Sequence, residues 1–344
     1  MIASWKHTLE AHGANFLNDH VADFGHAEAE RQQATHGAIV ADLSCLNLIQ
    51  FTGEDAQSFL QGQLSNDVRL LDGNNTQYTS YNTPKGRMLA NGLLWQSAPN
   101  TYVLQLPASL REAIQKRLSM FVMRSKVKVS DISDEWIRIG VGGLGANAAL
   151  TQVLGDIPTV VHGRTSFEHG SVMRLPGDTF EILLTLDQAP AIWDKLMPLA
   201  KPVGNACWDA LQIRAGIPTL LPATQEQFVA QMLNYELIGG VNFKKGCYPG
   251  QEIVARTQYL GKPKRRMYLA HIDASEPPQP GDELYSDDLP DQVTGMIVNA
   301  APATEDGFDV LAVIQISSAE GHTLHLKSMQ GSALVLQALP YAIP

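Results

Sequence analysis

Short apolar runs alternate with amphipathic stretches through the first 200 residues of the chain. Ala56, Phe59 and Leu60 recur at helical spacing, which predicts a helix that buries one face. Similar patterns predict helices near residues 108–121 and 189–199. Runs with the length and apolar content of strands lie at residues 38–43, 46–52, 76–81, 88–95, 102–106, 126–131, 137–141, 172–175 and 180–186. Strands mixed with helices in this way indicate an α+β fold.

The pattern changes to strands from about residue 267. Apolar runs such as MYLAHIDA, MIVNA, VLAVIQI and ALVLQALP are separated by Pro, Gly and Asp turn signals. This pattern predicts a C-terminal antiparallel barrel or sandwich.

Composition and charge narrow the class of protein. The 344 residues are 44% hydrophobic and 17% charged, which is typical of a globular chain of two or three domains. The formal net charge of −10 argues against binding a nucleic acid along the whole surface, although a local basic patch is compatible with it. The sequence contains no apolar run of the roughly 20 residues that span a membrane and no secretion signal at its start, so we expect a cytoplasmic protein without a membrane partner.

Cysteine usage limits the chemistry further. Cys45, Cys207 and Cys247 are widely spaced and form no CxxC pair, which argues against a disulfide framework or a zinc site. Three thiols are also too few for the usual four ligands of an iron–sulfur cluster. We therefore predict no metal site, and any cysteine chemistry depends on one thiol.

Cys247 is the candidate for that thiol. Pro249 suits the first turn of a helix, which places Cys247 just before the helix. The positive end of the helix dipole and the charges of Lys244 and Lys245 would favour the thiolate. The alternative is that Cys247 is a small buried apolar side chain.

A concentrated run of positive charge follows this helix. It consists of Lys262, Lys264, Arg265 and Arg266. These side chains could contact tRNA phosphates or a polyglutamate tail, and the alternative is a solvated face without a ligand.

The segment KGCYPGQE at 245–252 resembles the signature of the YgfZ-type folate-binding proteins, relatives of the aminomethyltransferase T-protein of the glycine cleavage system. The resemblance continues, in order, through blocks at 46–68, 82–94, 124–129, 211–218 and 239–256. It implies a three-domain, cloverleaf-like α+β architecture around a central cavity that accommodates tetrahydrofolate or a derivative, with a C-terminal antiparallel β-barrel. The implied domains are 1–125, completed by about 225–260, then 126–224 and 261–344.

The resemblance also implies a function. Members of this family are associated with the assembly or maintenance of iron–sulfur proteins and, in bacteria, with tRNA modification, so the expected partners are iron–sulfur client or assembly proteins and tRNA. The motif linked to this role falls on Lys245, Gly246, Cys247, Tyr248, Gly250, Gln251 and Glu252.

Two positions depart from the T-protein pattern. Ala90 and Asn91 stand where T-proteins carry paired aspartates, so no carboxylate is available there and we do not expect an active aminomethyltransferase. Arg214 stands where T-proteins carry a glutamate that binds the pterin edge, and an arginine accepts no hydrogen bond. Arg214 could instead engage a glutamyl carboxylate of folate or a neighbouring acid.

Trp208, on the same segment as Arg214, could stack on a pterin ring or fill a core. The leading hypothesis is a folate-binding accessory protein for iron–sulfur enzymes with Cys247 as its functional thiol. The alternatives are a folate-dependent one-carbon transferase and a tRNA- or protein-interaction module without catalysis.

Overall fold

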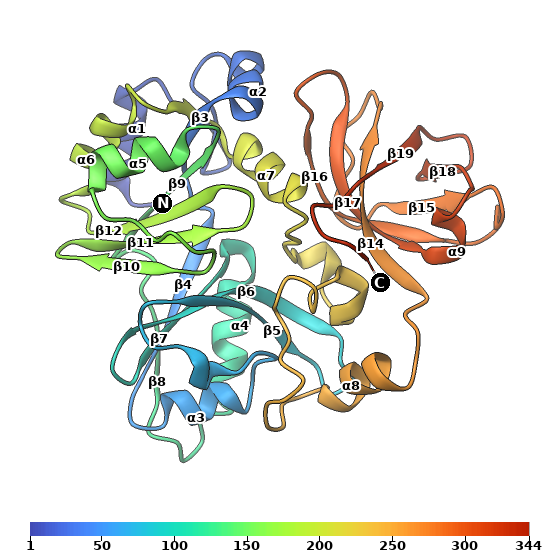
Figure 1. Cartoon of the computed structure of the whole chain (residues 1–344), viewed down its shortest axis with the longest axis horizontal. Helices are drawn as coiled ribbons and strands as arrows, with labels where there is room; N and C mark the ends of the chain where they lie inside the picture. The colour runs from blue at the N-terminus through green and yellow to red at the C-terminus, as the bar shows by residue number, and fades with distance from the viewer. Residues whose placement is uncertain (344) are drawn as a thin grey trace. The chain divides into compact units, whose positions relative to one another are not determined.

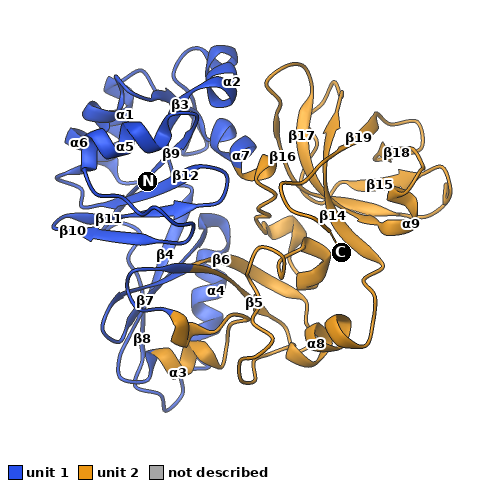
Figure 2. Ribbon diagram, viewed as in Figure 1, with its two compact units in different colours: residues 1–56, 71–76, 94–211 blue, residues 57–70, 77–93, 212–344 orange. Residues whose placement is uncertain are grey.

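The computed structural model describes residues 1–343, and the chain separates into two compact units (Figure 2). Unit 1 comprises residues 1–56, 71–76 and 94–211, and unit 2 comprises residues 57–70, 77–93 and 212–344. Each unit is therefore assembled from segments that are distant in sequence. The three-domain boundaries stay a prediction.

Unit 1 is built on a six-stranded sheet in the order β10-β11-β12-β9-β3-β13 (Figure 1). Alternating residues of its strand β3 supply two different cores, because successive side chains of a strand point to opposite faces. Val40 packs into one apolar cluster, whereas Ile39 and Ala41 pack into another. The strands are β3 (Ala38–Asp42), β9 (Ile137–Gly143), β10 (Arg164–Phe167), β11 (Gly170–Leu175), β12 (Thr179–Leu184) and β13 (Lys201–Val203).

Helices cover both faces of this sheet. The first cluster contains Trp5, Leu150 and Trp193, which come from α1 (Ala3–Ala11), α5 (Ala146–Leu154) and α6 (Ala189–Leu196). The second contains Ala34 from α2 (Ala27–His36), and Cys207 and Trp208 from α7 (Asn205–Arg214). A hairpin of β1 (Asn15–Leu17) and β2 (His20–Asp23) connects α1 to α2.

A second sheet has five strands in the order β5-β6-β7-β4-β8. Its strands are β4 (Leu46–Thr52), β5 (Thr76–Asn82), β6 (Met88–Ala98), β7 (Thr101–Pro107) and β8 (Lys128–Asp131). Helix α4 (Ala108–Met120) buries Leu110, Ile114 and Leu118, a four-residue spacing that places them on one face. The strand predicted at 46–52 is confirmed to the residue, and the others lie within a few residues of their predicted ends.

The C-terminal part of unit 2 is a closed barrel in the order β14-β17-β16-β15-β18-β19, shown in orange to red in Figure 1. The predicted α+β class with a C-terminal antiparallel barrel is therefore confirmed. The strands are β14 (Arg265–Ile272), β15 (Glu283–Ser286), β16 (Gly295–Pro302), β17 (Phe308–Gln315), β18 (Leu324–Leu326) and β19 (Ala333–Gln337), with the short helix α9 (Ile316–Ala319) after β17.

Short helices and 3₁₀ turns make up the remaining regular elements of unit 2. They are α3 (Ala56–Gln61), whose first residue belongs to unit 1, three 3₁₀ turns at Val68–Leu70, Pro222–Thr224 and Ala230–Leu233, and α8 (Gln251–Tyr259). Within residues 1–343, no helix is long and apolar enough to cross a membrane.

Candidate functional site

The motif segment forms a loop over residues 239–250 that leads into α8. The helix begins at Gln251, two residues later than expected, so the prediction that Pro249 lies in its first turn is wrong. Gly250 precedes the helix with a φ of +80°, a left-handed conformation that cannot be part of a right-handed helix. Cys247 consequently lies in the loop, four residues before the helix.

Lys245 anchors this loop through its side chain. Its ammonium donates hydrogen bonds to the backbone carbonyls of Gln61 (2.8 Å), Asn66 (2.9 Å) and Leu64, at and after the end of α3. The residue is 5% exposed, and burial lowers its pKa to about 8, an effect that the charge of Asp67 opposes. Its three N–H donors therefore match three carbonyl acceptors.

The turn after α3, which accepts the hydrogen bonds of Lys245, also binds the start of the loop. The Ser65 hydroxyl donates to the carbonyl of Gly240 (2.7 Å), and the side-chain amide of Asn66 donates to the carbonyl of Gly239 (2.7 Å). The backbone N–H of Asn242 donates to the carbonyl of Ser65 (3.1 Å). These contacts hold residues 239–242 against residues 65–66.

Gly250 anchors the other end of the loop. A Cβ on Gly250 would lie 2.5 Å from the Cα of Gly86 and 2.5 Å from the carbonyl oxygen of Thr83. Gly86 itself has a φ of +73° in the turn between β5 and β6. The two backbones thus approach too closely for any side chain at position 250.

Cys247 is exposed between these two anchors, so the alternative of a buried apolar cysteine is wrong. The neighbouring Gly246 has open space where a Cβ would lie. Tyr248 is buried, and the Lys245 Nζ lies 5.0 Å from the centroid of its ring. Burial raises the pKa of the Tyr248 hydroxyl to about 12. The structure therefore presents Gly246 and the thiol at the surface, while the flanking Lys245 and Tyr248 are buried.

The last two motif residues flank the start of α8. The Gln251 side chain donates to the carbonyl of Lys245 (3.4 Å), which closes the loop on itself. Glu252 is exposed in the first turn of the helix, where a carboxylate interacts favourably with the helix dipole.

Trp208 belongs to the core of unit 1. It is 3% exposed and lies against Gly140, where a Cβ would come 2.6 Å from the indole ring. The absence of a side chain at Gly140 thus makes room for the ring on the sheet. In this conformation the indole has no free face for a pterin, and its proposed stacking stays a prediction.

Asp209, the next residue on α7, was missed by the sequence analysis. Its side chain is exposed, and the surrounding protein desolvates the carboxylate and raises its pKa to about 6. An acidic residue inside the mostly apolar stretch CWDALQI was the signal that could have identified it. It is a carboxylate that can accept hydrogen bonds close in sequence to the position where T-proteins carry their glutamate.

Arg214, at the end of α7, pairs with an acidic side chain of the protein, which is one of the two partners that the sequence left open. Its Nε donates to Oδ2 of Asp309 (2.9 Å), and its Nη2 donates to the hydroxyl of Thr304 (2.8 Å). The other oxygen of Asp309 lies 3.2 Å from Nδ1 of His271. Arg214 thus binds barrel strand β17, which belongs to the same unit as Arg214.

Asn91, which the resemblance places at the position of a T-protein aspartate, has a structural role here. Its Nδ2 donates to the carbonyl of Pro218 (2.7 Å), and its Oδ1 accepts the backbone N–H of Leu220 (2.9 Å). Ala90 beside it is buried. The side chain of Asn91 therefore clamps residues 218–220.

The basic run divides into two exposed and two engaged side chains. Lys262 and Lys264 are exposed. Arg265 is half-buried and donates to the carbonyl of Val293 (3.1 Å), and Arg266 is buried in an ion pair with Glu236. The Arg266 side chain is consequently buried in the protein and is not available to an external phosphate.

Unit 1 contains buried charges that the sequence analysis did not single out. Glu181 accepts a hydrogen bond from Gln105 (2.7 Å), and burial raises its pKa to about 7. Arg138 is buried and donates to the carbonyls of Ser133 (2.6 Å) and Trp136 (2.9 Å). These groups carry polar contacts inside the unit.

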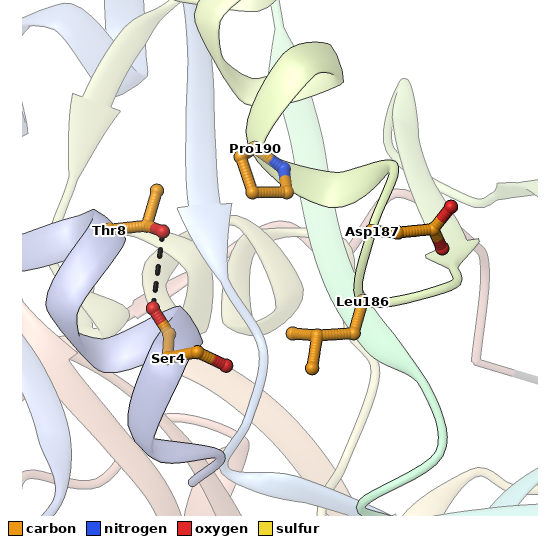
Figure 3. A pocket seen from close by; sticks show the side chains of 5 residues that line it. All are labelled: Ser4, Thr8, Leu186, Asp187 and Pro190. Atoms are coloured by element: carbon orange, nitrogen blue, oxygen red, sulfur yellow. Dashed lines mark hydrogen bonds between the residues drawn. The ribbon is translucent and has the colours of Figure 1, made fainter.

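One surface cavity of about 430 Å³ lies in unit 1 and is lined by Ser4, Thr8, Leu186, Asp187 and Pro190 (Figure 3). It includes none of the predicted site residues. Among the residues that the structure describes, no three His, Cys, Asp or Glu side chains gather as a metal site.

Comparison with known proteins gives a consistent family assignment. Residues 7–234 match the GCVT N-terminal domain model. Proteins described as tRNA-modifying protein YgfZ from Sodalis glossinidius and Escherichia coli O157:H7 are 31% identical over 301 and 304 residues, which is 86% of this chain and 90% and 91% of those proteins.

A solved structure agrees in fold. The glycine cleavage system aminomethyltransferase T from Bartonella henselae matches with a TM-score of 0.82 at 19% identity, over 98% of this chain and 96% of that chain. The T-protein-like architecture implied by the motif blocks is thus supported over nearly the whole length. The chain belongs to the YgfZ-type branch of the T-protein-like family that is defined by the GCVT N-terminal domain.

Proposed function

We propose that this chain is a cytoplasmic folate-binding accessory protein that supports iron–sulfur enzymes, including those that modify tRNA, with Cys247 as its functional thiol. The observation that carries the proposal is the exposed Cys247 held between two buried anchors, Lys245 and Gly250. The relatives named as tRNA-modifying proteins support the link to tRNA modification.

The geometry suits a thiol that meets another macromolecule. Anchors on both sides restrict the backbone of the loop, while the exposed thiol needs no opening of the fold to be reached. Cysteine thiolates are the common ligands of iron–sulfur clusters. Cys247 would supply one ligand to a cluster in transit, and the remaining ligands would come from the partner protein.

The fit of tetrahydrofolate depends on acceptors for the N–H groups of the pterin. Arg214 offers donors only and is paired with Asp309, and Trp208 is packed in a core. Asp209 is an exposed carboxylate that is ionised above a pH of about 6 and can accept such hydrogen bonds. We therefore assign Asp209, rather than Trp208 or Arg214, as the residue of α7 that would hold the pterin.

The thiol is tested in a strain that lacks this protein. Cys247→Ser should fail to restore the activity of iron–sulfur tRNA-modifying enzymes, measured from the modified nucleosides in bulk tRNA. Cys45→Ser is the matched control, because burial raises the pKa of the Cys45 thiol well above its ordinary value and makes it unreactive. Full restoration by Cys247→Ser would refute the role of the thiol.

Folate binding is tested by calorimetric titration of tetrahydrofolate into the purified protein. Asp209→Asn should weaken binding at pH 7.5, where the native carboxylate is ionised, whereas Asp178→Asn, which changes another exposed acid, should not. The absence of saturable binding to the native protein would remove folate from the proposal and leave the thiol to be judged by the first experiment.

A further inference from the structure

Helix α8 and the loop after it expose an unusual combination of side chains. Arg256, Tyr259 and Leu260 are spaced three and four apart, which places them on one face of the helix end. Tyr259 is 68% exposed and Leu260 is 84% exposed. We call the six exposed residues Lys244, Arg256, Tyr259, Leu260, Lys262 and Lys264 the α8 surface.

The charge of the α8 surface is opposite to that of the whole chain. Four of its six side chains are cationic, and Glu252 is the exposed acid of the same helix, whereas the chain carries a formal net charge of −10. A positive patch on an acidic protein attracts polyanions locally while the remaining surface repels them. The expected footprint on a nucleic acid is therefore a few phosphates rather than a long duplex.

The exposed Tyr259 ring is close in sequence to these cations and is fixed by a contact with another aromatic ring. Its ring contacts Phe243 in an edge arrangement, with 5.9 Å between centroids and 72° between planes. This contact fixes the exposed ring and brings the end of α8 next to Phe243, the neighbour of Lys244. Exposed aromatic rings flanked by Lys and Arg are the usual elements of single-stranded nucleic-acid binding, since bases stack on the ring and phosphates meet the cations.

We propose that the α8 surface binds a single-stranded segment of tRNA, with a base stacked on Tyr259 and phosphates bound by Arg256, Lys262 and Lys264. The choice of tRNA rests on the proposed function. The proposed site keeps Lys262 and Lys264 of the predicted basic run and adds Arg256. It leaves out Arg265 and Arg266, because these side chains are engaged within the protein. It also places RNA on the helix that begins four residues after the exposed Cys247.

The salt dependence of binding tests the phosphate contacts. A fluorescent oligouridine of about twelve nucleotides, similar in length to known single-strand sites, and an unmodified tRNA transcript are titrated with the full-length protein at several salt concentrations. Three phosphate contacts predict a slope of log K against log salt of about −2 for the oligonucleotide. Arg256→Gln, Lys262→Gln and Lys264→Gln should each reduce the slope by about 0.7, whereas Lys116→Gln, on exposed α4 surface, should not change it.

Substitution of the aromatic ring tests the stacking. Tyr259→Leu should weaken binding about five- to a hundredfold, whereas Tyr259→Phe should retain it, because stacking needs the ring and not the hydroxyl. The side chain is exposed, so neither change should unfold the protein. Unchanged affinity in Tyr259→Leu, or no saturable binding to either RNA by the native protein, would overturn the proposal.

Two further outcomes separate this inference from the proposed function. If Tyr259→Leu abolishes restoration of tRNA modification in the deletion strain but binds RNA normally, the α8 surface serves a protein partner and the RNA proposal is wrong. Tetrahydrofolate titration of the same variant is the control. Retained folate binding with lost RNA binding supports the proposal, and a native protein that binds RNA but no folate contradicts only the folate assignment.

Discussion

Gly250 and Gly86 touch through their backbones, so that the motif loop and the turn between β5 and β6 leave no space for a side chain at position 250. Gly250→Ala should destabilise unit 2 by about 2–4 kcal/mol, because the methyl group adds overpacking to the cost of a left-handed backbone. Gly246→Ala is the matched control and should change stability by less than about 1 kcal/mol, since nothing lies within 4 Å of the added Cβ.

These two variants are best followed by hydrogen exchange of the barrel and α8. All five tryptophans, Trp5, Trp95, Trp136, Trp193 and Trp208, belong to unit 1, so intrinsic tryptophan fluorescence reports mainly on that unit. Equal exchange rates for Gly250→Ala and Gly246→Ala would contradict the close approach.

Lys245 and Lys244 should respond very differently to the same substitution. Lys245→Met removes the donor to three buried or half-buried carbonyls and should destabilise unit 2 by about 2–4 kcal/mol. Lys244→Met changes an exposed side chain and should stay within about 0.5 kcal/mol. Limited proteolysis between residues 239 and 250 should accelerate in Lys245→Met only, and equal cleavage of both variants would show that the amine does not anchor the loop.

Asn91→Asp restores the residue type of the T-proteins and should still produce no aminomethyl transfer. The carboxylate would lose the hydrogen bond to the carbonyl of Pro218 and face it as a second acceptor, at a cost of about 1–3 kcal/mol at neutral pH. Asn299→Asp is a useful comparison, because Asn299 holds the same stretch through Thr219 and should cost a similar amount. Formation of methylene-tetrahydrofolate from an aminomethyl donor by Asn91→Asp alone would contradict this expectation.

Glu181 should make unit 1 less stable as the pH rises. Its pKa is about 7 in the folded chain and near 4.5 when unfolded, so the folded state holds a proton that the unfolded state releases between these values. Its carboxyl group therefore lowers stability progressively from pH 4.5 to 7. Glu181→Gln should stabilise the unit by about 1–3 kcal/mol at pH 8 and by almost nothing at pH 4.5.

Tryptophan fluorescence during thermal unfolding checks this pH dependence. Glu112→Gln, which changes an exposed acid on α4, is the control and should show no such difference between the two pH values. A Glu181→Gln variant that is equally stabilised at both pH values would mean that burial does not raise the pKa of this group.

Local patterns were sufficient to predict most of the fold. The strand at Leu46–Thr52 and the barrel strands have apolar runs of the right length between turn signals. Their pairing is less local, because Leu46–Thr52 pairs with β7 and β8, and β14 pairs with β17 and β19. The start of α8 was misplaced, because Pro249 favours a first helical turn in isolation while the contact of Gly250 with Gly86, 164 residues earlier, requires a left-handed residue.

The site was less predictable because its partners are remote in sequence. A lysine beside a cysteine suggests an activating charge, yet the partners of Lys245 are carbonyls of residues 61–66. Arg214 could be assigned to a ligand or to an acid, and the ion pair with Asp309 depends on the barrel strand that carries it. The exposure of Cys247 depends on the full fold, since Lys245 and Tyr248 in the same short segment are buried.

The anchoring of the motif loop on residues 61–66 also has a consequence for biosynthesis. At a translation rate of roughly 5–20 residues per second, the ribosome makes Lys245 about 10–40 s after Asn66. During that interval the carbonyls that receive the lysine have no native donor, and residues 57–70 and 77–93 lack the C-terminal segments of their own unit. The nascent chain therefore acquires its exposed thiol late, when all of unit 1 has been synthesised and the barrel strands are still to come.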